Sequence, residues 1–223
     1  MESKSKIKEK ISKKAAEILL NIGAINFNTK KLFKLTSGKL SPVYCDCRRI
    51  ISFPNERVDL INYSIALLKE KSYFKSLDNI AGGETAGIPF AAFISYKLKL
   101  PMTYIRKKSK EFGRKEKIEG LVRNGQKVVL VEDLITDGGS KWGFIESLIE
   151  KKTIIKAVLV IFNYGVLTNK LHFKNKNIDL IHLTDWQYII EVAMLKKKIK
   201  EKDLKIIVRF LNDIGVKNLK SFQ

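Results

Sequence analysis

Cysteine and histidine, the residues that build disulfide frameworks and zinc sites, are nearly absent from this 223-residue chain. Its two cysteines, Cys45 and Cys47, would point to the same face of a strand, which is a poor geometry for a mutual disulfide. Its two histidines, His172 and His182, cannot complete a zinc site without a second cysteine pair. We therefore expect no structural zinc and interpret both cysteines as small packing residues.

Long apolar runs are also missing, since none approaches the roughly 18 residues of a membrane span. The basic N-terminus, residues 1–14, is followed by no apolar signal stretch. It lacks arginine and contains Glu2 and Glu9, which argues against an organelle transit peptide. We expect a cytoplasmic protein with no membrane partner, forming one large domain or a core with a small appendage.

Acidic residues are few beside basic ones: 23 against 43, for a formal net charge of +20. Such a field favours anionic partners, including nucleic acids, membrane surfaces and phosphorylated small molecules. However, only seven of the 43 basic residues are arginines, the better residue for bidentate phosphate contacts. The lysines are spread over most of the chain. We interpret the excess as a solvated surface and do not expect nucleic-acid binding.

Helix and strand patterns alternate along the chain from about residue 55, which predicts an α/β fold with a mostly parallel, right-handedly connected sheet flanked by helices. Residues 33–51 are rich in turn signals and short strands, and residues 185–223 are largely helical. The charged stretch 107–119 lacks apolar periodicity and is interpreted as a mobile loop. The predicted helices cover residues 7–20, 56–71, 85–98 (with Thr85 as its cap) and 139–151. The predicted strands cover residues 102–106, 128–131 and 157–162, and one further short strand ends at Ala81.

Residues 128–140, VVLVEDLITDGGS, carry the clearest chemical signal. An apolar strand delivers Glu132 and Asp133 to the carboxyl edge of the sheet, where ligands bind in parallel α/β folds. The backbone N–H groups of Thr136 to Ser140 can converge at a helix N-terminus and bind a phosphate. The acidic pair can accept hydrogen bonds from vicinal hydroxyls and influence a nearby Mg²⁺. A phosphate site beside a diol site predicts a ribose 5-phosphate ligand.

Two other interpretations of this segment are weaker. A Walker loop is excluded because the Gly-Lys-Ser/Thr ending is missing. A surface turn rich in Asp and Gly is disfavoured because the apolar run, acidic pair, Thr and Gly-Gly-Ser occur in order.

Residues 132–140 resemble the phosphoribosyl-pyrophosphate (PRPP) signature of the type I phosphoribosyltransferases. Three further segments resemble the orotate phosphoribosyltransferases in particular. These are FKLTSGKLSPVY at 33–44 with Asp46 and Arg48, AGGETAGIP at 81–89, and YIRKKSKEFG at 104–113. The four motifs occur in collinear order, and the resemblance covers residues 6–183.

The resemblance implies a type I phosphoribosyltransferase-like fold with a small N-terminal hood. Residues 1–54 would form the first helix and the hood, 55–184 the core, and 185–223 a C-terminal helical segment. The activity implied is transfer of 5-phosphoribosyl from PRPP to orotate, giving orotidine 5′-monophosphate and pyrophosphate in UMP biosynthesis. Transfer to another base, and a PRPP-sensing regulator that binds nucleic acid on the same fold, remain alternatives.

The resemblance also implies roles for individual residues. Residues 82–86 would lie near the pyrophosphate, and a flexible loop, Arg106–Gly113, would be shared across a homodimer. Mg²⁺ would be the cofactor, held mainly by the substrate, with Glu132 and Asp133 nearby. The implied catalytic residues are Arg106, Lys107 and Lys110; the orotate-binding residues are Tyr44, Thr136 and Tyr164; the PRPP-binding residues are Glu132, Asp133, Leu134, Ile135, Thr136, Asp137, Gly138, Gly139, Ser140, Thr85 and Ala86.

Three positions depart from the family pattern. Phe112 stands where the flexible loop often carries His, so no histidine acid catalysis is expected there. Asn163-Tyr164 stands where many members carry Asp-Arg, and Thr36 stands where many carry Lys. These changes bear on the base more than on phosphoribosyl transfer.

Replacing Lys110 with alanine should lower turnover at least tenfold, because the lysine charge would stabilise the pyrophosphate as it leaves. Steady-state kinetics with saturating substrates measure this. Wild-type turnover in the Lys110→Ala variant would remove this loop from the mechanism.

Overall fold

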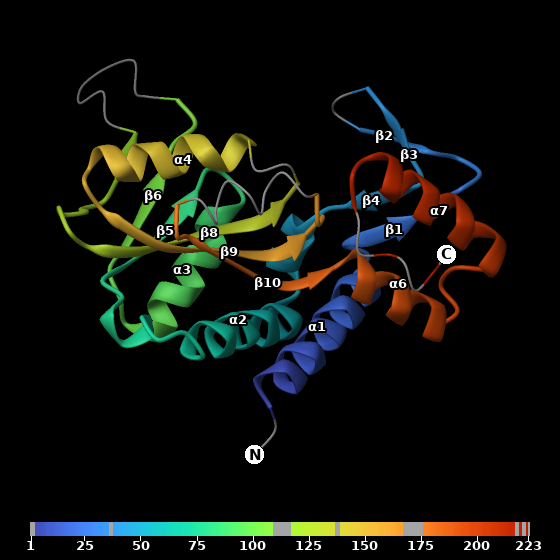
Figure 1. Cartoon of the computed structure of the whole chain (residues 1–223), viewed down its shortest axis with the longest axis horizontal. Helices are drawn as coiled ribbons and strands as arrows, with labels where there is room; N and C mark the ends of the chain where they lie inside the picture. The colour runs from blue at the N-terminus through green and yellow to red at the C-terminus, as the bar shows by residue number, and fades with distance from the viewer. Residues whose placement is uncertain are drawn as a thin grey trace.

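The computed structural model describes residues 3–35, 38–108, 117–136, 139–166, 176–216, 219 and 222. Within them lies a six-stranded sheet of order β10-β9-β8-β5-β6-β7 (Figure 1). All its neighbouring strands are parallel except the outermost pair, β6 and β7. The strands are β5 (Asn79–Gly83), β6 (Met102–Ile105), β7 (Ile118–Glu119), β8 (Lys127–Ile135), β9 (Ile154–Asn163) and β10 (Asp179–Asp185).

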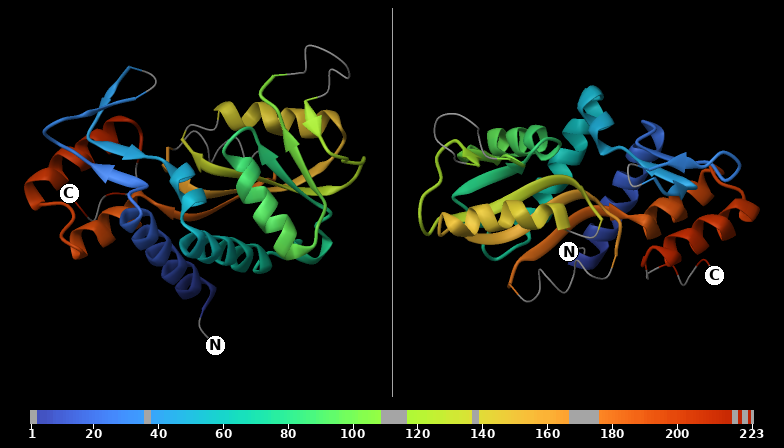
Figure 2. Two further views of the ribbon diagram at one scale, coloured as in Figure 1. Left: turned by 180° about the vertical axis from the view of Figure 1, so that it is seen from behind. Right: turned by 90° about the horizontal axis from the view of Figure 1, so that it is seen from above.

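Helices cover both faces of this sheet, which confirms the predicted α/β class. The first three helices lie on one face and α4 on the other, while α6 and α7 extend beyond the sheet edge (Figures 1 and 2). The bounds are α1 (Lys4–Asn21), α2 (Pro54–Lys69), α3 (Gly87–Leu98), α4 (Gly139–Glu150), α6 (Trp186–Leu195) and α7 (Glu201–Asp213); two 3₁₀ turns are η1 (Cys47–Ser52) and η2 (Phe74–Ser76).

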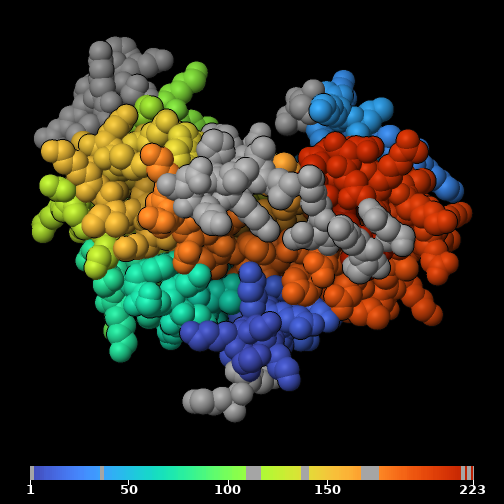
Figure 3. Space-filling model, viewed as in Figure 1, coloured from blue at the N-terminus to red at the C-terminus, as the bar shows by residue number. Residues whose placement is uncertain are grey.

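A small N-terminal hood stands beside the carboxyl ends of the strands. It consists of two antiparallel pairs: β1 (Ile25–Phe27) with β4 (Val43–Cys45), and β2 (Phe33–Lys34) with β3 (Leu40–Ser41). The arrowheads of β8 and β9 point toward it in Figure 1, and the outline of the molecule dips between α4 and the hood in Figure 3. The short strands predicted within residues 33–51 are therefore present.

The C-terminal helices brace this hood. The Thr29 hydroxyl donates to Asp203 Oδ1 of α7 at 2.5 Å. The Phe27 ring lies 6.5 Å from Trp186, the first residue of α6. Each view in Figure 2 places α7 beside the hood strands. The helices α6 and α7 are thus packed against the N-terminal region.

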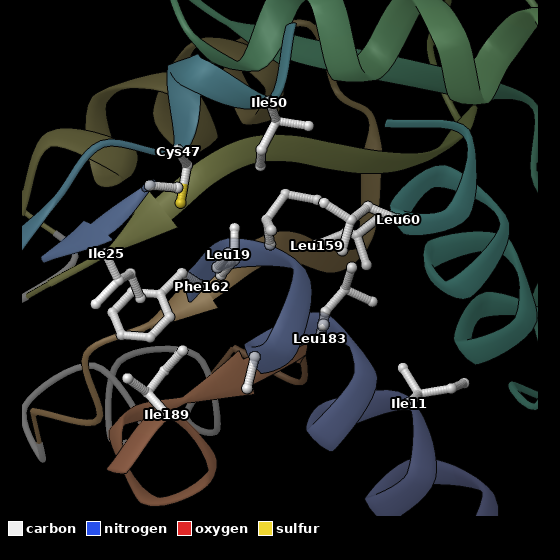
Figure 4. Packing of buried hydrophobic residues seen from close by; sticks show 14 of the residues in the cluster. Ile11, Leu19, Ile25, Cys47, Ile50, Leu60, Leu159, Phe162, Leu183 and Ile189 are labelled. Carbon is white, nitrogen blue, oxygen red and sulfur yellow. The ribbon is translucent and has the colours of Figure 1, made fainter. Parts of the chain in front are cut away.

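The central strands pack into the interior on both faces. Along β8, Val129 and Val131 belong to the cluster under α1–α3, whereas Val128 and Leu130 belong to the cluster under α4. This alternation follows from the two-residue period of a strand, and burial on both faces explains the uninterrupted apolar run. Figure 4 shows the first cluster, where Leu159 lies among residues from α1, α2 and β10.

Some sequence predictions of strands were too short. The strand expected at 128–131 continues to Ile135, so the acidic pair lies inside β8 rather than after it. The extension occurs because β9 keeps pairing with β8 as far as Ile135 opposite Asn163. The strand β10 was not predicted. The stretch 107–119, expected to be all loop, ends in β7, which pairs with β6.

The predicted cap of α3 was wrong. The helix begins at Gly87 with Ala86 at the N-cap position and no side-chain cap hydrogen bond, so Thr85 lies one residue before the cap. The first residue of the helix instead packs closely on β8, since a Cβ on Gly87 would lie 2.3 Å from the Val131 carbonyl oxygen. The other predicted helices agree with the structure to within a few residues.

The two cysteines are free, as expected, with Cys47 fully buried and Cys45 half-buried. They do not share a strand, because Cys45 ends β4 and Cys47 begins η1, and their sulfurs are 3.6 Å apart. Among the described residues, no helix has the length and apolar character needed to cross a membrane.

Truncating Leu159, which is 1% exposed, to alanine should lower the free energy of unfolding by about 2–5 kcal/mol, because it leaves a cavity in the larger cluster. Urea denaturation measures this. The matched control is Leu195→Ala on α6, where the leucine is 75% exposed and the change should stay within about 0.5 kcal/mol. Equal losses in both variants would contradict this description of the core.

Candidate active site

Several of the predicted site residues that the structure describes lie at one edge of the sheet. The four strands β9, β8, β5 and β6 are consecutive neighbours and parallel, so their carboxyl ends meet there. The residues that follow these ends are Tyr164, Thr136, Glu84 and Arg106. Backbone hydrogen bonds join the neighbouring strand ends, from Tyr164 N to the Ile135 oxygen at 2.9 Å and from Glu84 N to the Ile105 oxygen at 2.9 Å.

The turn between β5 and α3 lies directly against the acidic pair of β8. A Cβ on Gly83 would lie 1.9 Å from Glu132 Oε1, and one on Gly82 would lie 2.9 Å from Ile88 Cα. Glycine is therefore required at both positions for the backbone to approach this closely. The turn contains a cis peptide bond between Glu84 and Thr85, and Thr85 is exposed. The segment expected near pyrophosphate thus adjoins the segment expected near ribose.

Glu132 is a buried carboxylate, only 2% exposed. Its Oε2 accepts a hydrogen bond from Lys141 Nζ at 3.0 Å, and the lysine side chain is itself 14% exposed. Burial raises the pKa of Glu132 to about 7, although the Lys141 charge acts in the opposite direction. Its Oε1 has no hydrogen-bond donor among the described residues. Lys141, in the first turn of α4, was not identified from the sequence.

Asp133 points to the opposite face of β8, as the two-residue period requires. Its charge acts on Cys47 and on Arg48 of η1, so the carboxylate lies on the hood side of the sheet. It is 8% exposed. The two acidic residues therefore serve different surroundings, with Glu132 facing α4 and Asp133 facing the hood.

Tyr44 and Tyr164, both expected at the base, lie near each other around the cysteine pair. Burial raises the pKa of Tyr164, and Cys45, Cys47 and Tyr44 act in the same direction. The Tyr164 ring packs edge-on at 5.3 Å against both Phe162 and Trp186, and the Tyr44 ring lies 5.6 Å from Phe33. This region is a half-buried, largely aromatic surface at the end of β9.

The basic residues after β6 lie next to the β5–α3 turn. The Lys107 N–H donates to Glu84 Oε2 at 2.7 Å, and Arg106 Nη1 lies 3.6 Å from Glu119 Oε1. The Lys107 side chain is exposed. Lys110 lies outside the described residues.

The expected phosphate loop is described only at its ends. Thr136 is exposed after β8, and Gly139 and Ser140 begin α4, whereas Asp137 and Gly138 lie outside the described residues. Leu134 and Ile135 turn their side chains into the hydrophobic clusters, and both residues pair with β9 through their backbone. Sequence order alone places the intervening residues between β8 and α4.

The amino-acid sequence of this chain matches a recognised protein family. A family model described as the phosphoribosyl transferase domain matches residues 56–198. An orotate phosphoribosyltransferase of Ruegeria sp. (strain TM1040) is 42% identical over 207 residues, which are 92% of this chain and 91% of that protein. Another, from Cereibacter sphaeroides (strain ATCC 17029 / ATH 2.4.9), is 43% identical over 187 residues, covering 83% of this chain and 81% of that protein.

Solved structures agree with this match. The crystal structure of orotate phosphoribosyltransferase from Aeropyrum pernix superposes with a TM-score of 0.67 at 25% identity, covering 83% of this chain and 99% of that one. The structure of Leishmania donovani UMP synthase has a TM-score of 0.73 at 24% identity, covering 90% of this chain and 42% of that one, and shows likeness of fold alone.

Glu132 should make stability depend on pH. Its native pKa, about 7, is raised above the ordinary value of 4.5, so the folded state binds more protons between these values. The free energy of unfolding should therefore fall as pH rises from 4.5 to 7 and then level off. The Glu132→Gln variant should lose this dependence. Its free energy of unfolding minus that of wild type should therefore rise by up to about 3 kcal/mol between pH 4.5 and pH 7.

Urea denaturation at pH 4.5 to 8.5 measures this difference. The matched control is Glu146→Gln, at an exposed glutamate of α4. A constant difference between Glu132→Gln and wild type at every pH would show that the carboxyl is not buried against the β5–α3 turn.

Proposed function

This chain belongs to the phosphoribosyltransferase family, and from that premise we propose its function: it is an orotate phosphoribosyltransferase. It transfers 5-phosphoribosyl from PRPP to orotate, giving orotidine 5′-monophosphate and pyrophosphate in pyrimidine biosynthesis. The observation that carries the assignment is identity of 42% along nearly the whole chain, together with the acidic pair and glycine-rich turn meeting at one sheet edge.

The reaction separates charge, and the site residues match that separation. Breaking the bond from C1 to pyrophosphate develops positive charge on the ribose and negative charge on the leaving group. We assign Arg106, Lys107 and Lys110 to the leaving group, since preorganised cations lower the barrier most where charge develops. The support from geometry is that Lys107 follows β6 and its backbone is bonded to Glu84 of the neighbouring turn.

We assign PRPP to the carboxyl edge of the sheet, between the β5–α3 turn and the start of α4. Thr136 to Ser140 would bind the 5-phosphate through backbone N–H groups at a helix N-terminus. Asp133 would accept hydrogen bonds from the ribose hydroxyls on the hood side, and the unpaired Oε1 of Glu132 would be the second acceptor. Thr85 and Ala86 would border the pyrophosphate.

Magnesium fits this arrangement as an ion carried mainly by the substrate. Among the described residues, no group of three His, Cys, Asp or Glu side chains could hold a metal ion. Mg²⁺ commonly binds through one or two carboxylates together with substrate phosphates, which matches an acidic pair beside a pyrophosphate site. Asp133 is the better placed of the two, because Glu132 is paired with Lys141. The ion would neutralise charge on the leaving group.

We assign the base to the side of Tyr44, Thr136 and Tyr164. The half-buried aromatic surface around Tyr164 suits a planar ring, and closure of the basic loop would exclude water that would hydrolyse the ribosyl centre. The boundaries proposed remain 1–54 for the hood region, 55–184 for the core and 185–223 for the C-terminal segment.

A homodimer that shares the loop Arg106–Gly113 remains a proposal. Two features support it: Arg106 follows β6 beside the outermost strand β7, and Tyr96 on α3 is 85% exposed. A cytoplasmic location is supported by the two free thiols 3.6 Å apart, which suit a reducing compartment.

A spectrophotometric assay of orotate consumption with PRPP and Mg²⁺ tests the function. We expect orotate to be consumed and adenine, hypoxanthine and uracil to be left unchanged. Faster consumption of another base, or none of orotate, would contradict the assignment and favour transfer to a different base or a PRPP-binding regulator.

A further inference from the structure

The base of the proposed reaction is an anion, and the end of β9 offers it no positive charge. Orotate carries a carboxylate on its pyrimidine ring. Asn163 is 3% exposed, and its Oδ1 accepts the Gly165 N–H at 2.9 Å, so this side chain shapes the turn. Tyr164 is held edge-on between Phe162 and Trp186. A cation that binds the carboxylate would therefore come from another element.

The 3₁₀ turn η1 presents two arginines beside this surface. Its three-residue repeat buries Cys47 and Ile50, which point from the turn into the core in Figure 4, and leaves Arg48 and Arg49 outside. The turn packs against β8 near Asp133. Either arginine is therefore a candidate by position.

Arg49 is already engaged elsewhere. Its Nε donates to the Ile22 carbonyl oxygen at 3.1 Å, and its Nη2 would lie 3.7 Å from a Cβ on Gly23. These contacts bind the guanidinium to the connection between α1 and β1. Lys141, on the other face of the sheet, is engaged by Glu132.

Arg48 is held in position through its Nε, and its side chain is largely exposed. Its Nε donates to Asp46 Oδ1 at 2.7 Å, while the side chain remains 63% exposed. Asp46 is anchored in turn, because its backbone N–H donates to the Ala24 oxygen at 2.7 Å. The Asp46 carboxylate raises the pKa of Arg48, and Tyr44 and Asp133 add to this, so the guanidinium lies within electrostatic reach of both.

We propose that Arg48 determines the base specificity of this chain, its terminal guanidinium nitrogens binding the carboxylate of orotate while Asp46 holds the Nε side. A guanidinium bound at Nε keeps the donors on its terminal nitrogens, which match a carboxylate in a bidentate pair. The inference rests on the proposed function and assigns one contact within it. Arg48 selects a carboxylated pyrimidine, and Asp46 is its positioning residue.

The test compares two nucleotides that differ only in the carboxylate. Orotidine 5′-monophosphate carries it and uridine 5′-monophosphate lacks it, so titration calorimetry of both isolates its contribution. In Arg48→Gln we expect orotidine 5′-monophosphate to bind at least tenfold more weakly and uridine 5′-monophosphate to change less than twofold. In turnover, KM for orotate should rise at least tenfold while KM for PRPP stays within twofold.

Two further variants keep the result interpretable. Arg48→Lys retains the charge and should recover part of the lost affinity for orotidine 5′-monophosphate. Arg209→Gln removes one positive charge from α7 and should leave both nucleotides unchanged, which controls for the net charge of the protein. Because Arg48 is exposed, its variants should melt within a few degrees of wild type.

Equal weakening of both nucleotides in Arg48→Gln would overturn the inference, since the contact would then involve the phosphate or ribose. Unchanged binding of both would overturn it as well. Failure of the wild type to consume orotate would overturn the proposed function itself. Orotate turnover by wild type with unchanged kinetics in Arg48→Gln would overturn the Arg48 assignment alone.

Discussion

The active-site end of this molecule depends on one buried carboxylate. Glu132 lies where β8, the β5–α3 turn and α4 meet, touching Gly83 on one side and Lys141 on the other. The contact with Gly83 leaves no room for a Cβ, and the buried charge needs a cation because an unpaired one would be strongly destabilising. Three segments far apart in sequence are thereby fixed relative to one another, and each carries residues assigned to PRPP.

Because side chains alternate between the two faces of β8, its two neighbouring acidic residues have different surroundings. Glu132 is held in the interior by Lys141, whereas Asp133 emerges on the opposite face toward η1 and the hood. A sugar lying across the end of β8 would meet Asp133 on the side where the base must also lie. On the proposed assignment, the strand period would put the ribose contact between the start of α4 and the hood.

Much of the fold could be predicted from the sequence, because central parallel strands are apolar on both faces and leave a continuous signal, as in Val128–Val131. The edge strand β10 left no such signal, since Asp179, His182 and Asp185 interrupt its apolar residues. The Glu132–Lys141 pair could not be predicted, because its members are nine residues apart on different elements and only packing joins them. The start of α3 was missed because no side chain caps it, and the close approach of Gly87 to Val131 is visible only in the packed structure.

The base side of the site depends on parts of the chain that motifs do not cover. Tyr164 packs against Trp186, Trp186 lies near Phe27 of the hood, and Asp185 caps α6 by accepting from two backbone N–H groups. The hood is therefore in contact with the C-terminal segment through aromatic residues that lie outside the four sequence motifs. Phosphoribosyl binding can be identified from short motifs because it uses backbone and acidic residues of the core. The proposed base contacts Tyr44 and Arg48 lie in a motif, but their surroundings depend on how the hood packs against α6 and α7, which the motifs do not describe.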